Sequence, residues 1–489
     1  MRHFLPALLL ASTPAFAQIT PQDVINDWRS YFGAFDGTVS TGTPVVTGAT
    51  TRYNNIEAEM EIMETEVRYQ FDWVEMRNNG DGTLEMTVSP RGVASSLANL
   101  PNGDSVESLT SYDLARLTAV ISGTPDEITY AYSAPRLSMR QSQQMPGGAL
   151  VLTSALDAFS GNSVTTRDAA TGTLSTIADF SADSLRLDAS ISPPGDAQID
   201  ISYVAAGFAS DVAYSLPSPG PSRIFLDGME FKAAIRMGET GMDLETRRLG
   251  GVDKINFTQA SGELGFGFDG TSMTYSVVSE GGAFEAVNTA SALPVAAGFE
   301  RASFAFALPL RKSETPVPFS FAFALENISL GDDIWALFDP EATLSRAPAS
   351  FEISVAGTMQ LFVDLLDRSA MDALRNTPFE LRSLSLSSLS LDVEGAGLNG
   401  AGDLSFNAAA VDPATGMPEP LGALDFTLTG ALGLLDKIGR LGFADPMLVI
   451  GAKGALGMFG SPGSGPDSFT SRIEFSEGGR VSINGQQVK

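Results

Sequence analysis

The side chains that most often carry metal and nucleophilic chemistry are nearly missing from this sequence. Among 489 residues there is no cysteine, and the single histidine is His3. Beyond that position the composition excludes serine–histidine–aspartate triads, cysteine nucleophiles, zinc sites with nitrogen or sulfur ligands, histidine-held haem and iron–sulfur clusters. What remains is carboxylate, lysine, tyrosine or serine–lysine chemistry, together with calcium or magnesium held by oxygen ligands.

Carboxylates are abundant, but their pattern selects no catalytic pair. With 58 acidic residues in the chain, the two members of a glycosidase-type pair can come from anywhere. The densest group alternates with apolar residues, which indicates the solvated face of a strand rather than converging cation ligands. Its members are Glu57, Glu59, Glu61, Glu64 and Glu66.

Other segments resemble known site motifs but lack residues that those motifs require. The segment 78–85 resembles a calcium loop, but Arg77 stands where the first acidic ligand belongs, and this favours a hairpin turn. The glycine-rich segment 395–402 has no following lysine and serine or threonine, so it is not a phosphate loop. Neither Ser-x-x-Lys nor Gly-x-Ser-x-Gly occurs. We therefore assign no catalytic residue, no metal ligand and no cofactor, and leave the ligand-binding residues open.

Composition restricts the class of partner. The net charge of −28 argues against nucleic acid, because nucleic-acid binding needs a basic footprint. An apolar fraction of 43% predicts a folded core. The absence of cysteine means that no disulfide supports that core, so burial must stabilise it.

The amino-terminal residues read as a secretory signal peptide. Arg2 precedes an apolar run over 4–11, and Ala15-Phe16-Ala17 is a small-x-small cleavage signal. We predict residues 1–17 as the signal, with cleavage after Ala17. No later apolar run reaches the ~20 residues that a membrane-spanning helix needs, so no transmembrane segment is expected after the signal is removed. A signal of this type on an acidic chain with six lysines predicts a bacterial periplasmic protein.

The rest of the chain predicts many strands and few helices. Thr20 can cap a helix that starts at Pro21 and ends at Gly33. Apolar and polar residues then alternate over 56–62 and 67–73, with a phase change that a β-bulge would explain. A proline-rich segment, 216–221, is the candidate boundary between an N-terminal β-rich region, 18–216, and a C-terminal β-rich region, 222–489. A long surface turn is the alternative for that segment.

In the C-terminal region two phenylalanine-rich runs predict a hairpin. Residues 304–310 and 319–325 each carry bulky apolar side chains on one face and small ones on the other. We expect that face to lie on a core, so that replacing Phe306 or Phe321 with Asp would abolish ligand retention or folding. A phase change at Ser387-Ser388 predicts a second bulge.

The remaining C-terminal patterns fix the fold class. Residues 395–402 are predicted as a tight connection, and helical spacing is found over 334–338, 361–375 and 432–441. The predicted fold is mainly β, either all-β or α+β. It consists of large, curved antiparallel sheets with a few packing helices.

Several C-terminal segments carry a family resemblance. They are SLGDDIWALFDPEATLSRAPASFEISVAG from Ser329, then GLNGAGDLSF, then PEPLGALDFTLTGALGLLDKIGRLG, then GGRVSINGQQV. With the Trp335–Pro340 motif and the hairpin at Ile483-Asn484-Gly485, the chain resembles domain-of-unknown-function family 2125, whose members are envelope proteins of alphaproteobacteria. The resemblance covers most of the mature chain and is strongest from Ser329 onward. It implies an envelope location and brings no activity and no catalytic residue.

Three functions stay open at this point. The first is a non-enzymatic envelope protein that binds or carries an apolar ligand such as lipid in a curved sheet, for which an open apolar groove would be the sign. The second is a structural or assembly protein that acts through contacts with another envelope protein. The third is a carboxylate-dependent hydrolase, which would need two facing carboxylates in a cleft.

Overall fold

The fold is mainly β, as predicted, with 67% of residues in strands and 11% in helices. The computed structural model describes residues 18–62, 65–99, 105–145, 147–217, 228–288, 291–367, 370–371, 374, 377–411, 418–442 and 444–489. The signal-peptide prediction for 1–17 and most of the predicted boundary at 216–221 lie outside the described residues. The helices of the described part are α1 (Pro21–Gly33), α2 (Asp332–Phe338), α4 (Ala431–Leu441) and α5 (Pro446–Phe459).

The chain forms two compact units whose residues interleave along the sequence. Unit 1 contains 1–144, 155–182 and 213–228, and unit 2 contains 145–154, 183–212 and 229–489. Four long strands therefore have residues in both units. They are β9 (Glu127–Met145), β10 (Gly148–Arg167), β11 (Leu174–Ser192) and β12 (Gln198–Leu216).

Unit 1 is built from short antiparallel hairpins around a well-packed core. Its other strands are β1 (Thr38–Ser40), β2 (Val45–Thr47), β3 (Thr50–Ile62), β4 (Thr65–Asn78), β5 (Leu84–Val88), β6 (Arg91–Asn99), β7 (Ser105–Asp113) and β8 (Thr118–Thr124). Met76, Leu84 and Ile121 are fully buried in this core, with 0% of their surface exposed. Burial of these apolar side chains stabilises unit 1.

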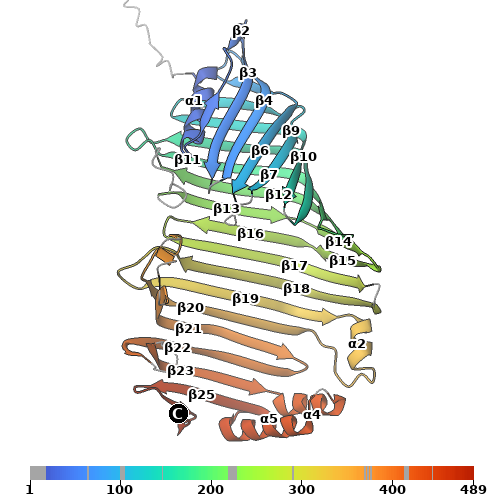
Figure 1. The fold of residues 1–489 in the computed structure, drawn as a ribbon. Helices are drawn as coiled ribbons and strands as arrows, with labels where there is room; N and C mark the ends of the chain where they lie inside the picture. The colour runs from blue at the N-terminus through green and yellow to red at the C-terminus, as the bar shows by residue number, and fades with distance from the viewer. Residues whose placement is uncertain are drawn as a thin grey trace, which may run out of the picture. The chain divides into compact units, whose positions relative to one another are not determined.

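Helix α1 forms where the sequence predicts it. The Thr20 side chain accepts a hydrogen bond from the backbone of Asp23, and the Asp23 carboxylate accepts one from the Thr20 backbone, which is a capping box. Val24 and Ile25 are fully buried in the unit 1 core, and α1 contacts β1 and β3 (Figure 1).

The phase change between residues 62 and 67 is a hairpin, so the predicted bulge at this point is wrong. Ile62 pairs with Thr65 and Glu61 with Glu66, so the chain reverses there and the alternation restarts on a new strand. One acidic residue of this hairpin, Glu59, forms an ion pair with Arg68 of the facing strand at 2.7 Å. No described residues form a group of three or more potential metal ligands.

The segment 78–85 belongs to the β4–β5 hairpin, as predicted.

Unit 2 is a long succession of antiparallel strands (Figure 1). β17 pairs with β18 along one edge and with β15 and β16 along the other, and each strand from β18 to β23 pairs with the next. β25 then pairs with β23. The strands are β13 (Glu230–Met237), β14 (Thr240–Arg248), β15 (Gly251–Gln259), β16 (Ser261–Phe268), β17 (Ser272–Asn288), β18 (Ser291–Pro309), β19 (Val317–Leu330), β20 (Ala349–Leu361), β21 (Phe379–Val393), β22 (Ala396–Val411), β23 (Pro418–Thr429), β24 (Ser461–Pro462), β25 (Ser468–Ser476), β26 (Arg480–Ile483) and β27 (Gln486–Gln487).

Two C-terminal predictions are confirmed and two are corrected. The phenylalanine-rich runs pair as β18 and β19, and the register between β20 and β21 shifts beside Ser387, as a bulge requires. Most of 395–402 is strand β22 rather than a connection, because only Glu394 and Gly395 form the turn. The helix predicted over 361–375 does not begin where expected, since Leu361 ends β20 and 362–367 is not helical.

The Trp335–Pro340 motif has a structural role. Trp335 is buried and its ring lies 4.9 Å from that of Phe338 in α2. The helix ends at Phe338, and the buried carboxylate of Asp339 accepts hydrogen bonds from the backbone of Thr343 and Leu344 at 2.8 Å each. These bonds satisfy the carboxylate and fix the loop that follows α2.

A buried hydrogen bond in unit 1 provides a test of its core. Tyr130, 3% exposed, donates to Asp27 at 2.7 Å, and burial raises the pKa of that carboxyl group. Tyr130→Phe leaves the carboxyl without this donor, so we expect the free energy of unfolding to fall by about 1–3 kcal/mol in urea titrations. The control is Tyr275→Phe, at a partly exposed position, with an expected change below about 0.5 kcal/mol. Equal effects of the two variants would contradict this packing.

Candidate functional site

One face of the unit 2 sheet is apolar across many strands. Because paired residues of an antiparallel sheet point to the same side, the register aligns bulky side chains in rows that cross the strands. One such row runs Phe321, Val355, Leu386, Gly402, Leu424, Ile473 and Ile483. The opposite face carries small and polar residues, such as Ser354 beside Ala322.

This apolar sheet face is not buried like a core. Phe321 is 38% exposed and Leu391 is 36% exposed, whereas the central side chains of unit 1 are fully buried. Phe304, Phe306 and Phe323 are only partly buried. The prediction that the phenylalanine face lies on a core is therefore wrong. The rings pack on one another, but they are only partly buried and keep contact with solvent. One example is the edge-to-face contact between Phe304 and Phe321, whose ring centroids lie 5.5 Å apart.

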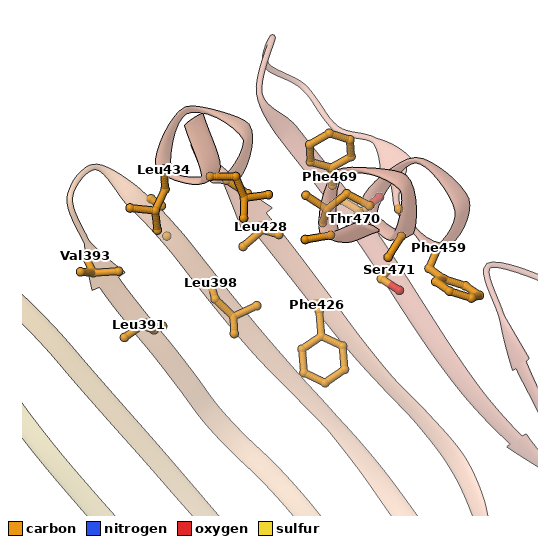
Figure 2. Close-up of a pocket in the computed structure, with 18 residues that line it drawn as sticks. Leu391, Val393, Leu398, Phe426, Leu428, Leu434, Phe459, Phe469, Thr470 and Ser471 are labelled. Atoms are coloured by element: carbon orange, nitrogen blue, oxygen red, sulfur yellow. The ribbon is translucent and has the colours of Figure 1, made fainter. Parts of the chain in front are cut away.

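At the last strands of unit 2, this apolar face becomes an open groove of about 570 Å³. Strands β21, β22, β23 and β25 form its floor, and α4 and α5 form its walls. Figure 2 shows Leu391, Leu398 and Phe426 following one another across neighbouring strands, with Leu434 of α4 beside them. The lining residues are Leu391, Val393, Ala396, Gly397, Leu398, Phe426, Leu428, Ala431, Leu434, Leu435, Ala452, Ala455, Leu456, Phe459, Gly460, Phe469, Thr470 and Ser471.

The groove and the apolar sheet face are one continuous surface. A single row joins Leu325 of β19 to Phe351, Leu391, Leu398, Leu428 and finally Phe469 of β25. The last four of these residues line the groove. A bound apolar chain could therefore extend from the groove along the sheet without crossing a polar barrier in this row.

A glycine makes room for an aromatic ring in the groove floor. A Cβ atom on Gly400 would lie 2.7 Å from the Phe426 ring, so a side chain at this position would displace the ring. The ring therefore occupies the space beside Gly400 in β22. Among the lining residues that the structure describes none is ionisable, so this groove offers apolar contact and no acid–base chemistry.

Helix α4 is fixed to the sheet by two carboxylates. Its N-cap, Gly430, has no side chain, and Asp467 replaces a cap by accepting from the backbone of Leu432 and Gly433 at 3.1 and 3.0 Å. The second carboxylate, Glu394 in the β21–β22 turn, forms an ion pair with Lys437 of α4 at 3.2 Å. Both contacts orient the apolar side of α4 toward the groove.

Glu394 also contacts the loop that precedes β20. It is 5% exposed and accepts hydrogen bonds from the backbone of Ser345 and Arg346, at 2.7 and 3.0 Å. Burial by itself would raise its pKa, but the hydrogen bonds from Ser345 and Lys437 outweigh this effect and lower the pKa below its ordinary value. The ionised form of Glu394 therefore stabilises the folded state.

Helix α5 is held more lightly. Asp445 caps its first turn, and Lys453 forms an ion pair with Asp436 of α4 at 2.6 Å, where both side chains are solvent-exposed to a third or more. At the other end, the Asn484 side chain donates to the carbonyl of Phe459 at 2.8 Å. An exposed ion pair contributes only about 0–1 kcal/mol, so the polar contacts of α5 stabilise its position less than those of α4 do.

The sequence patterns predict the apolar sheet face but not the groove. Phe306 and Phe321 lie on the apolar sheet face, but neither lines the groove. The helical spacing over 432–441 predicts α4, whereas the apolar run 448–459, which forms most of α5, is not among the predicted helices. Its helical spacing of Ala452, Leu456 and Phe459 was the signal that could have identified a groove wall.

Comparison with known proteins assigns neither a family nor a function to this chain. The chain matches no protein-family model and no curated protein. The resemblance to the envelope family stays a prediction. In the part of the chain that the structure describes, no helix has the length and hydropathy that a membrane crossing requires.

The acid dependence of stability tests the role of Glu394. Because its pKa is lowered in the folded state, its contribution is present above the ordinary glutamate pKa of 4.5 and is lost as the pH falls below that value. Glu394→Gln is expected to lower the free energy of unfolding by about 1–3 kcal/mol at neutral pH and to flatten its fall in acid. Thermal unfolding between neutral and acid pH measures both effects.

Glu477→Gln, in the exposed β25–β26 turn, is the matched control for this experiment. We expect its unfolding curves to follow those of the unaltered chain at each pH. If Glu394→Gln also followed them, Glu394 would not fix α4 to the sheet.

Proposed function

We propose that this chain is a non-enzymatic protein that binds an apolar chain, such as the acyl chain of a lipid, in the groove between the unit 2 sheet and helices α4 and α5. The observation that carries the proposal is the groove itself. Its volume of about 570 Å³ falls within the range of small-molecule sites, and only Thr470 and Ser471 among its lining residues carry side-chain polar atoms.

The physical chemistry of the groove favours an acyl chain over a polar ligand. Each buried methylene contributes about 0.8 kcal/mol, so ten of them supply about 8 kcal/mol before the cost of association. A charged ligand would find no counter-charge among the described lining residues. Thr470 and Ser471 provide hydroxyl groups that can bond an ester or carboxyl end at the margin.

The proposal places the protein in the bacterial envelope, in the periplasm. Support comes from the sequence: a secretory signal over 1–17 with cleavage after Ala17, and the resemblance to an envelope family. A carrier of lipid chains suits that compartment, because lipids must cross water between membranes there.

A structural or assembly role through protein contacts is the second candidate. The observation in its favour is the exposed apolar surface of α5, where Met447, Leu448 and Ile450 are each more than 60% exposed. A carboxylate-dependent hydrolase gains no support from the groove, whose described lining residues include no carboxylate.

Filling the groove tests the proposal. Ala455 lines it from α5, so Ala455→Trp places a large ring in the space that an acyl chain would use. We expect the affinity for a fluorescent polyene fatty acid, measured by titration without vesicles, to fall at least about tenfold. The control is Ile450→Trp, on the same helix but outside the groove, which should bind like the unaltered chain. Equal affinities for all three proteins would overturn the proposal.

A further inference from the structure

The apolar face of unit 2 reaches far beyond the groove. The strand pairings align a second row from β13 to β25, and every residue of this row from β13 to β23 is apolar. Ionisable side chains of the same strands, such as Arg236, Glu263 and Glu352, lie one residue out of phase and therefore on the opposite face. The row includes Ile235, Val277, Phe304, Phe323, Ile353 and finally Phe426, which lines the groove.

This row is longer than a single acyl chain. From β13 to β25 it makes nine strand-to-strand steps, which at about 4.8 Å each cover about 43 Å of the sheet. The acyl chain of one membrane leaflet covers about 15 Å, half of the ~30 Å hydrocarbon core. The groove takes up only the steps from β21 to β25. The rest of the row, about 29 Å long, has room for two more chains.

We propose that the part of this row from Ile235 to Ile353 is a lipid track, on which acyl chains bind end to end beyond the chain in the groove. One protein then carries several lipid chains at once. The inference rests on the proposed function, because the groove is the enclosed site at which the lipid track ends. A chain on the lipid track contacts only the sheet, so we expect it to bind at least about tenfold more weakly than a chain in the groove.

The groove helices favour a flexible chain over a second protein sheet as the occupant. Leu434 of α4 and Leu456 of α5 line the groove together with Leu398 and Phe426 of the sheet, so both helices lie on its apolar side (Figure 2). Two sheets pack face to face at about 10 Å, and a helix fills a layer of about the same thickness. A second copy laid along the row would therefore collide with the helices before it covered the groove end, whereas an acyl chain passes beneath them.

Charge also opposes a second copy. Each chain carries a net charge of −28, so two chains repel each other when they approach. The hydrocarbon part of a lipid carries no charge and adapts its shape to an uneven surface. Acyl chains therefore meet neither of the two obstacles that a second copy meets.

Photolabelling of the mature chain tests the lipid track. The probe is a palmitic acid that carries a diazirine group, added at increasing concentrations in buffer without detergent or vesicles, and peptide mass spectrometry locates the label. We expect labels on groove residues first and, at concentrations at least about tenfold higher, on residues of the lipid track such as Phe304 and Phe323. Ser303 and Ala324, which pair on the opposite face, are the internal control and should stay unlabelled.

Two neighbouring positions of β19 provide the variants. Phe321 lies on the apolar face, its ring centroid is 5.5 Å from that of Phe304, and it is 38% exposed. Phe321→Asp therefore places a charge beside the lipid track, and we expect labelling of the lipid track to fall at least about fivefold while groove labelling is unchanged. The matched control is Ser320→Asp, at an exposed position on the opposite face, which should be labelled like the unaltered chain.

Failure of the lipid track and failure of the proposed function give different results. Labels confined to the groove at every concentration overturn the lipid track and leave the groove proposal intact, whereas absence of any label overturns both. Equal labelling of the two sheet faces overturns the lipid track, as does undiminished labelling of it in Phe321→Asp. A dimer that keeps the probe off this face also overturns it. If circular dichroism shows that Phe321→Asp is unfolded, the comparison of the two faces in the unaltered chain decides.

Discussion

The antiparallel register of unit 2 is the constraint on which the rest of this structure depends. It brings the bulky residues of successive strands to one side, so that a row such as Leu325, Phe351, Leu391, Leu398 and Leu428 crosses the sheet unbroken. Apolar burial is the main driving force of folding, yet these side chains stay partly exposed, unlike those in the core of unit 1. An apolar surface of this kind has a use when a ligand completes its burial.

The two C-terminal helices turn the end of this surface into a groove. Polar contacts decide where they lie: Asp467 replaces the missing cap of α4, and Glu394 joins the helix to the strand turn below it. By contrast, the polar contacts described for α5 with the rest of unit 2 include an exposed ion pair and a side-chain hydrogen bond, and apolar side chains of α5 pack at the groove. Both helices present apolar side chains to the groove, which suits a site for a long apolar chain.

Local sequence patterns correctly predict those elements that depend on neighbouring residues along the chain. The capping box at Thr20 and Asp23, the alternating runs that became β18 and β19, and the bulge beside Ser387 all follow from propensity and period. Errors arose where pairing decides the outcome. The change of phase near residue 62 has the same appearance for a bulge and for a tight hairpin, and only the partner strand separates the two.

The groove could not be predicted for the same physical reason. Its floor combines residues more than 70 positions apart, such as Leu391 and Phe469, which lie in one row only through the register of three successive strand pairings. Whether a side chain is buried also depends on which other residues cover it, and the alternation of apolar and polar residues does not reveal this. The glycines of 395–402 predict a tight connection, although Gly400 serves to make room for the Phe426 ring within a strand.

Native mass spectrometry of the protein purified from the cells that make it, combined with lipid extraction, tests the central claim most directly. The account predicts a reproducible mass increment that corresponds to a co-purifying lipid or fatty acid, and loss of this increment in the Ala455→Trp variant. A chain that is reproducibly free of any apolar ligand, whether or not a protein partner accompanies it, would contradict the claim that the groove of unit 2 holds an acyl chain.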